Sequence, residues 1–250
     1  MIERVFDGLA QFYRLCGSAS EGAHTIERDG VLAAVVPAAP ERPVVNGVVY
    51  ESADALEAAY DEVAAAYDEI GAKWTVWVRP GDEAAARLLD SRGHVLDAQP
   101  MTMAHDLDGV ERPAPDALPD WTREGDFADV GPLNDRAYPF GTDSFTRALG
   151  ALSRDDTTHV YLAHDDGEPV GCLVMADHEG NSDVQMVAVA PEARGRGISG
   201  NLLGHALADA VERGMESATL VSTMLGLPVY ERAGFRSLGR ASMWERRRDA

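Results

Sequence analysis

The four residues Arg194, Gly195, Arg196 and Gly197 form the pattern in this chain that is best suited to chemistry. Glycine lacks a Cβ atom, so the two glycines let the backbone turn tightly and bring its N–H groups within reach of an anion. The arginines add positive charge that persists at physiological pH. A buried strand over 184–189 precedes the loop and an amphipathic helix follows it, so free N–H groups and a helix N-terminus converge on one point. The sequence therefore predicts a site for an anion such as a pyrophosphate.

Other phosphate loops and metal sites fit the chain poorly. A nucleoside-triphosphate loop needs Gly-Lys-Ser/Thr after the glycines, and Lys73 is the only lysine. A dinucleotide loop needs a parallel strand before it and an acid about twenty residues further on. Glu216 lies near that distance, but the hairpin pattern before the loop is antiparallel. The seven histidines and two cysteines are scattered, so we expect no metal site.

The loop and its surroundings closely resemble the acetyl-coenzyme A signature of the GNAT superfamily of N-acetyltransferases. That signature reads Gln or Arg, two residues, Gly, one residue, then Gly or Ala; residues 194–199 fill it, with Ser199 as a departure at the last position. The resemblance covers roughly residues 120–246 and includes the segment 230–235 downstream. It implies that acetyl-coenzyme A binds as a cosubstrate through Val187, Ala188, Val189, Arg194, Gly195, Arg196, Gly197, Ile198, Ser199, Gly200 and Thr223.

The resemblance also implies transfer of an acetyl group from the thioester to an amine by direct attack in a ternary complex. The strand before the loop bulges in this family, which makes the N–H of Val187 the expected donor to the developing oxyanion. Tyr230 occupies the position of the tyrosine that protonates the coenzyme sulfur. A phenol has a pKa of about 10 and stays protonated at neutral pH. The alternative is that Tyr230 only packs under the last strand.

Asp183 is the predicted general base, four residues before Val187 on the same strand, where several family members have glutamate. A solvated strand start is the alternative for Asp183, and the hairpin residues Asp177, His178 and Glu179 are rivals for the base. Thr223 either touches the cofactor or caps the helix that follows it. The segment 138–143 is expected to line the acceptor side, or to be an ordinary turn between helices.

The second half alternates helices and strands in the order of that family. Helical patterns around 127–137 and 144–153 come first, followed by three antiparallel strands, the signature helix, a strand at 218–222, a short helix and a final strand at 235–244. Three prolines within 112–119 predict a stiff linker over 109–119.

The first half contains a faint internal repeat of the second. At an offset of 141 residues, 88–93 aligns with 229–234. The segment that matches the phosphate loop, 48–54, has no glycine, no arginine and two carboxylates, so it cannot hold a pyrophosphate. We therefore expect two GNAT-like α+β domains, each with a mixed, mostly antiparallel central sheet flanked by helices. They are a degenerate one at 1–108 and an acetyltransferase domain at 120–250, joined by the linker 109–119. Convergent strand–helix–strand patterning is the alternative.

The charge and the cysteine content of the chain limit its expected binding partners and location. The chain has 42 acidic and 22 basic residues and a net charge of −20, which disfavours nucleic acid and anionic membranes. The same charge attracts a cationic amine, although it can also serve solubility alone. Two cysteines, one in each half, and the absence of a secretory or membrane-spanning pattern predict a cytoplasmic protein. A homodimer is possible.

Together these features predict an acetyl-coenzyme A-dependent N-acetyltransferase with a small-molecule or peptide amine as acceptor. The first half is expected to supply packing surface and one wall of the acceptor cleft. The main alternative is a catalytically silent acyl-coenzyme A sensor that keeps the loop without using Tyr230 or a base. An acyl donor other than acetyl is a further alternative.

Overall fold

The computed structural model describes residues 1–114, 120–138, 142–152 and 156–247, which form two compact units. The seven-stranded unit consists of residues 1–8, 101–146 and 152–238, and the six-stranded unit consists of residues 9–100, 147–151 and 239–250. Residues 115–119 of the predicted linker and 139–141 of the predicted acceptor segment lie outside the described residues.

The sheet of the seven-stranded unit is mixed and mostly antiparallel, as predicted. Neighbouring strands follow the order β12, β6, β11, β10, β9, β8, β7. Pairing is antiparallel from β7 to β10, parallel between β10 and β11, and antiparallel between β11 and β6. The strands are β6 (Met101–Asp106), β7 (Trp121–Thr122), β8 (Thr158–Asp165), β9 (Glu168–His178), β10 (Asn181–Val189), β11 (Ser217–Ser222) and β12 (Arg236–Arg240).

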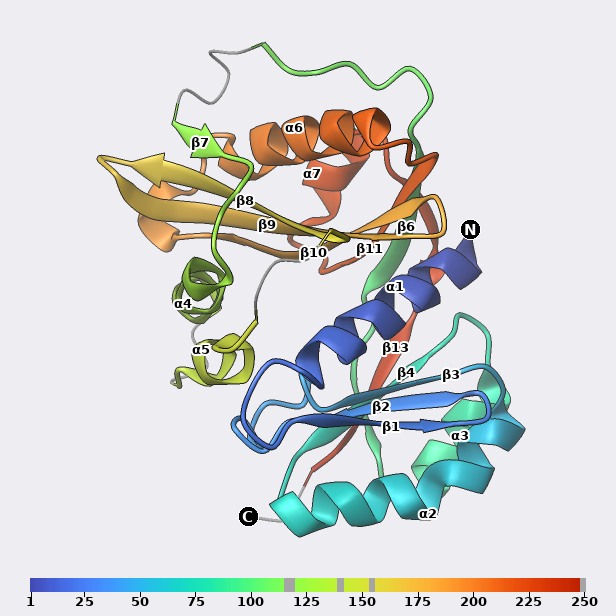
Figure 1. The fold of residues 1–250 in the computed structure, drawn as a ribbon. Helices are drawn as coiled ribbons and strands as arrows, with labels where there is room; N and C mark the ends of the chain where they lie inside the picture. Colours follow the sequence, from blue (N-terminus) through green and yellow to red (C-terminus); the bar gives the residue numbers. More distant parts are fainter. Residues whose placement is uncertain (115–119, 139–141, 153–155, 248–250) are drawn as a thin grey trace. The chain divides into compact units, whose positions relative to one another are not determined.

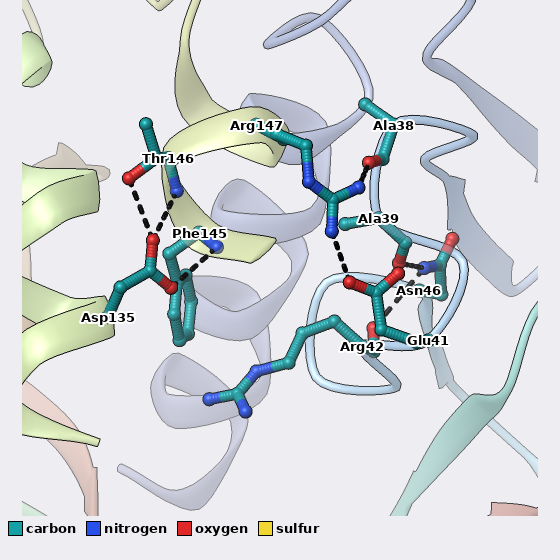
Figure 2. Close-up of polar contacts among 9 residues, drawn as sticks. All are labelled: Ala38, Ala39, Glu41, Arg42, Asn46, Asp135, Phe145, Thr146 and Arg147. Carbon is teal, nitrogen blue, oxygen red and sulfur yellow. Dashed lines mark hydrogen bonds and ion pairs between the residues drawn. The ribbon is translucent and has the colours of Figure 1, made fainter. Parts of the chain in front are cut away.

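Helices cover both faces of this sheet. Helix α4 (Phe127–Ala137) lies on one face and α6 (Ile198–Glu212) on the other, while α7 (Leu227–Arg232) follows β11 (Figure 1). The Asp126 carboxylate caps α4 by accepting the Ala128 N–H at 3.0 Å. Farther along α4, the Asp135 carboxylate accepts the backbone N–H groups of Phe145 and Thr146 at the start of α5 (Ser144–Leu149), as Figure 2 shows.

The six-stranded unit has a second mixed sheet, in the order β1, β2, β3, β4, β13, β5. Only the pair β3–β4 is parallel. Helices α2 (Ala53–Ile70) and α3 (Glu83–Ser91) cover one face (Figure 1), with the stacked rings of Tyr67 and Trp74 in the core. The strands are β1 (His24–Arg28), β2 (Val31–Val35), β3 (Gly47–Tyr50), β4 (Trp74–Val78), β5 (Val95–Ala98) and β13 (Ser242–Arg246).

Side chains also fix one irregular loop and one helix of the six-stranded unit. The buried Asn46 amide accepts the Val36 N–H and donates to the carbonyl oxygens of Ala39 and Arg42, which shapes the loop between β2 and β3. The Arg147 guanidinium donates to the Ala38 carbonyl of the same loop (Figure 2). Helix α1 (Ile2–Cys16) contributes Tyr13, whose hydroxyl accepts the Trp77 indole N–H at 2.5 Å.

Each sheet contains one strand from the other end of the chain. Strand β6 comes from the first half and pairs with β11, whereas β13, from the end of the chain, lies between β4 and β5. The single strand predicted over 235–244 is therefore wrong: it is interrupted at Ala241 into β12 and β13, which join different sheets. The compact units likewise do not follow the predicted boundaries at 108 and 120, because a strand's pattern of apolar side chains does not identify its partner strand.

The two sheets share one connection pattern. In each, a parallel pair (β3–β4 or β10–β11) is followed by an inserted antiparallel strand and then by a strand from the same half of the chain. Strands β5 and β12 begin at Val95 and Arg236, and β6 and β13 begin at Met101 and Ser242, so both pairs keep the same offset of 141 residues. Among the described helices, none combines the length and apolar character needed to cross a membrane.

Candidate active site

The loop between β10 and α6 leaves the N-terminus of α6 without a side-chain cap. Gly195 and Gly197 have φ angles of 77° and 76°, in the left-handed region that favours glycine. Gly197 is the N-cap residue and, having no side chain, gives the first turn of the helix no cap hydrogen bond. A Cβ atom on Gly195 or Gly200 would meet nothing within 4 Å, so both positions face open space. The first N–H groups of α6 and its positive dipole end are thus oriented toward solvent, which suits an anion.

The side chain of Ile198 holds this helix end against the sheet. Ile198 is buried, and a Cβ atom on Gly171 of β9 would come within 2.7 Å of its Cγ2 atom. Glycine at position 171 therefore allows the first turn of α6 to approach the strand that precedes the bulge region.

The two loop arginines have different surroundings. Arg194 donates to two backbone carbonyl oxygens, of Ala137 at 2.7 Å and of Val189 at 3.3 Å, and so links the end of α4 to the end of β10. Arg196 forms an exposed ion pair with Asp165, at the end of β8. Arg194 thus has a structural role in this conformation, and Arg196 is the arginine on the open side of the loop.

Strands β10 and β11 separate as they approach the loop. Their parallel pairing is limited to residues 181–183 opposite 217–219, although β10 continues to Val189 and β11 to Ser222. On its other side β10 carries a β-bulge, because the register with β9 passes from Gln185 to Ala188. Met186, within the bulge, has a φ of 49°, a conformation that side-chain-bearing residues rarely adopt.

Side chains bond to both carbonyl oxygens of the bulge. The Cys172 thiol donates to the Met186 oxygen at 3.2 Å, and the Tyr138 hydroxyl donates to the Val187 oxygen at 3.0 Å. Burial raises the pKa of Cys172 to about 12, so this group remains a thiol and a donor. Since the peptide bond is trans, the N–H of Val187 points away from the Cys172 sulfur.

Tyr230 lies on α7, the short helix that follows β11. Its ring packs edge-on against Phe235, with ring centroids 5.9 Å apart. Burial raises the pKa of the Tyr230 phenol, and the nearby Tyr138 adds to the shift. Tyr230 therefore stays protonated across the physiological range.

Asp183 is a buried carboxylate at the point where β10 and β11 begin to separate. It accepts hydrogen bonds from Thr219 Oγ1 at 2.8 Å and Gln185 Nε2 at 3.0 Å. Its carboxyl group lies against Gly8 of α1, where a Cβ atom would come within 2.3 Å of Asp183 Cγ. Burial raises the pKa of Asp183 to about 7, against the effect of both hydrogen bonds. The alternative of a solvated strand start is wrong, because Asp183 is only 5% exposed.

Asp183 also lines a small pocket of about 70 Å³. Asp7 and Arg4 of α1 line the same pocket, together with His178 and Glu179 of the hairpin between β9 and β10. The pocket therefore brings the predicted base together with two of its three rivals.

The third rival, Asp177, lies in a different environment. Burial opposes its ionisation, but hydrogen bonds from His159, Arg213 and Ser182 outweigh that effect and hold the pKa of Asp177 well below its usual range. Its Oδ2 atom lies 2.6 Å from Arg213 Nε. A carboxylate fixed in this way is a poor proton acceptor at neutral pH.

Thr223 participates in the turn that leads into α7. Its hydroxyl oxygen accepts the N–H of Gly226 at 3.3 Å, and its carbonyl oxygen accepts the N–H of Leu227 at 3.1 Å. This geometry favours the helix-entry alternative, and the cofactor contact of Thr223 stays a prediction.

The matching region of the six-stranded unit is closed. Helix α2 has a side-chain cap, since Ser52 Oγ accepts the Ala55 N–H at 3.2 Å. Beyond the parallel pair, Arg79 donates to the Tyr50 carbonyl oxygen at 3.2 Å and the Tyr50 hydroxyl donates to Asp82 at 2.8 Å. The helix end and the strand ends that are open in one unit are thus bonded in the other.

Several residues of this site carry no sequence signal that identified them. Cys172 stood out only as one of two cysteines, and Gly8 and Arg4 precede every predicted element. Thr219 and Gln185 alternate with apolar residues in ordinary strand patterns. Tyr138 was included in the predicted acceptor segment, but its contact with the bulge depends on how α4 packs on β10.

Comparisons with known proteins agree with this geometry. Residues 156–237 match the family model described as acetyltransferase (GNAT) domain, a region that includes the bulge and the loop. No curated protein matches the chain. The matched region, 156–237, is thus similar to a GNAT acetyltransferase domain.

Solved structures match nearly the whole chain. A GCN5-related N-acetyltransferase from Kribbella flavida is 15% identical with a TM-score of 0.69, covering 97% of this chain and 95% of that one. One from Sphaerobacter thermophilus is 19% identical with a TM-score of 0.58, covering 97% and 93%. A tandem GNAT protein from the clavulanic acid biosynthesis pathway is 14% identical with a TM-score of 0.57, covering 98% and 95%. At these identities the likeness establishes the fold. Among the described residues, no group of three or more His, Cys, Asp or Glu could hold a metal ion.

Proposed function

We propose that the seven-stranded unit binds acetyl-coenzyme A and transfers its acetyl group to an amine. Two features of one stretch of chain carry this proposal: a β-bulge at Met186–Val187 near the end of β10, and helix α6, which follows the glycine loop and whose N-cap, Gly197, gives no side-chain cap. A bulge presents backbone groups outside the ladder, and an uncapped helix end attracts an anion. A single ligand with a diphosphate at one end and a thioester at the other can bind the helix end with its diphosphate and the bulge with its thioester.

The loop fits a diphosphate by its backbone more than by its arginines. The N–H groups of Ile198, Ser199 and Gly200 belong to the first turn of α6, and the absence of a side chain at Gly200 leaves room beside them. Arg196 can leave its exposed partner Asp165 at small cost, since exposed ion pairs contribute little. Arg194 keeps the loop attached to α4 and β10.

The chemistry requires a neutral amine, a donor for the oxyanion and a proton for the thiolate. Asp183 accepts a proton from the acceptor's ammonium group, directly or through water, which leaves a nitrogen lone pair to attack the thioester carbonyl carbon. The Val187 N–H donates to the oxyanion while the new C–N bond forms. As the C–S bond breaks, the Tyr230 hydroxyl donates its proton to the sulfur, and the second proton released by the attacking nitrogen returns through water to the Tyr230 phenolate. The products are an N-acetylated amine and coenzyme A.

The six-stranded unit is proposed to be a second GNAT-like domain that has lost its site. The shared connection pattern and the constant offset of 141 residues support a tandem origin. The cap on α2 and the bonds made by Arg79 and Tyr50 support the loss of cofactor binding there.

Coenzyme A release with a panel of amines tests the proposal. The panel includes polyamines, amino acids, amino sugars and peptides with a free N-terminus, and free thiol is measured after addition of acetyl-coenzyme A. Release that depends on an amine supports the transferase. Tight binding of acetyl-coenzyme A without release by any amine would instead support the sensor, and a longer acyl donor that reacts faster than acetyl would revise the donor.

A further inference from the structure

A continuous chain of hydrogen bonds connects Arg4 on α1 with Asp183 on β10. Arg4 Nη1 donates to Ser217 Oγ at 2.5 Å, and Ser217 Oγ donates to Asn181 Oδ1 at 2.8 Å. Asn181 Nδ2 donates to Thr219 Oγ1 at 2.8 Å, and Thr219 Oγ1 donates to Asp183 Oδ1 at 2.8 Å. The three residues between the ends are at most 3% exposed, so water does not compete for these bonds.

The chemistry of Arg4 determines the direction of every bond in this chain. A guanidinium has donors and no acceptor, so Ser217 must accept from Arg4 and use its own hydrogen for Asn181. The Asn181 amide then has its oxygen toward Ser217 and its NH₂ group toward Thr219. An amide nitrogen cannot accept, so the Thr219 hydroxyl has to donate to Asp183.

We propose that Arg4 is a positioning residue for the acetyl transfer: through Ser217, Asn181 and Thr219 it keeps a hydroxyl hydrogen directed at Asp183 and so stabilises the carboxylate that receives the proton of the amine. This inference rests on the proposed function, in that Asp183 acts as the base. Arg4 itself touches neither the amine nor the thioester.

The second carboxylate oxygen and the pocket complete the arrangement. Gln185 Nε2 donates to Asp183 Oδ2 at 3.0 Å and to the Gly8 carbonyl at 3.2 Å, so both carboxylate oxygens are held by donors. The charged or titratable groups that face the pocket are Arg4 and Asp7 from α1 and His178 and Glu179 from the hairpin, and Glu216 lies 4.0 Å from Arg4. A proton that reaches Asp183 cannot pass along the chain, because each neighbour already donates toward the carboxylate. It must leave through the pocket.

The test compares Arg4→Gln with Arg4→Lys. Glutamine can donate or accept and removes the fixed direction, whereas lysine has donors only. The pKa of Asp183 is measured by ¹³C NMR of the aspartate carboxyl carbons, with Asp183→Asn for assignment. We expect Arg4→Gln to raise the pKa of Asp183 by about one unit, since a donor to a charged group is lost, and Arg4→Lys to leave it nearly unchanged. Thr219→Val removes the hydroxyl that donates to Asp183 and should raise the pKa of Asp183 more than Arg4→Gln does. Thr219→Ser keeps a hydroxyl and should not raise this pKa.

A further variant distinguishes the hydrogen-bond chain from a purely electrostatic or structural effect of Arg4 on the pKa of Asp183. Glu216→Gln changes the charge beside Arg4 without touching the chain and should leave the pKa of Asp183 unchanged. An unshifted pKa in Arg4→Gln, an equal upward shift in Arg4→Lys, or a downward shift in Glu216→Gln, where a negative charge is removed, would overturn the proposal. The titration needs no acetyl-coenzyme A, so the pKa shift of Asp183 can appear in a protein that transfers no acetyl group. In that case the proposed function fails, while the hydrogen-bond chain from Arg4 to Asp183 is still supported. In an active enzyme, the acidic limb of the kcat profile should move with the NMR value while KM stays constant.

Discussion

The hydroxyl group of Tyr138, at the end of α4, lies 3.0 Å from the carbonyl oxygen of Val187 in the bulge of β10 and donates a hydrogen bond to it. With the Cys172 thiol on the Met186 carbonyl, this contact fixes the orientation of two successive peptide planes. The direction of the Val187 N–H thus depends on side chains from α4 and β9.

Replacement of Tyr138 by phenylalanine should therefore lower kcat more than it weakens cofactor binding. We expect a loss of about tenfold in kcat, because an oxyanion donor that is poorly aligned stabilises the transition state less. Steady-state kinetics with a saturating amine give the measurement. Tyr161→Phe is the matched control. Tyr161 contacts Arg213 instead of the bulge, so the kcat of this variant should equal that of the parent enzyme. Equal losses in both variants would contradict the role of Tyr138.

Tyr230→Phe tests the proton donor to sulfur. The phenol of Tyr230 stays protonated, because burial raises its pKa above the ordinary value of 10.0. Removal of a general acid typically costs about 10² to 10⁴ in rate, and we expect a loss of kcat in this range with an unchanged KM for acetyl-coenzyme A. An acyl donor with a more acidic leaving thiol should recover most of the rate. A fully active Tyr230→Phe enzyme would leave Tyr230 as a packing residue only.

Asp183→Asn should change the pH dependence of stability. The pKa of Asp183 is about 7 in the folded protein and has an ordinary value of 3.8. Between these values the folded state binds the additional proton, so stability falls as the pH rises. Asp183→Asn has no carboxyl group at this position, so its stability does not fall in this way as the pH rises. The difference in free energy of unfolding, variant minus parent, should therefore increase between pH 4 and pH 8 by up to about 4 kcal/mol. Urea unfolding at several pH values measures it. A difference that does not vary with pH would show that Asp183 is not a raised carboxyl.

In the parent enzyme, the ionised form of Asp183 is the active one. We expect kcat to rise with pH through a midpoint near the pKa of about 7 and Asp183→Asn to lose this limb. A pH profile that is the same in the variant would exclude Asp183 as the base.

The local elements around the site followed from the sequence because they depend on local rules. The glycines at 195 and 197 indicated a tight turn, and both have positive φ. The amphipathic pattern after the loop corresponds to α6, and the three antiparallel strands predicted before the loop correspond to the β8–β9–β10 meander. The surroundings of Asp183 did not follow, because Thr219, which donates a hydrogen bond to it, and Gly8, which packs against it, are distant from it along the chain.

Long-range pairing was the part that the sequence did not reveal. The predicted domains 1–108 and 120–250 would each hold a sheet built from its own strands, which would place Met101–Asp106 in the first sheet and Ser242–Arg246 in the second. Instead the two strands are exchanged. The local sequence of a strand does not identify its partner, and the choice depends on the packing of whole layers.

Titration of acetyl-coenzyme A by calorimetry is the most direct test of the central claim, that the uncapped end of α6 holds a diphosphate. The measurement compares the parent with Gly197→Ala and Gly214→Ala, which introduce the same left-handed strain at opposite ends of the helix, at φ values of 76° and 86°. We expect sub-millimolar binding to the parent and to Gly214→Ala, and binding at least about tenfold weaker for Gly197→Ala, since only that change displaces the amides. No binding to the parent at millimolar concentrations, or equal affinity for all three proteins, would contradict it.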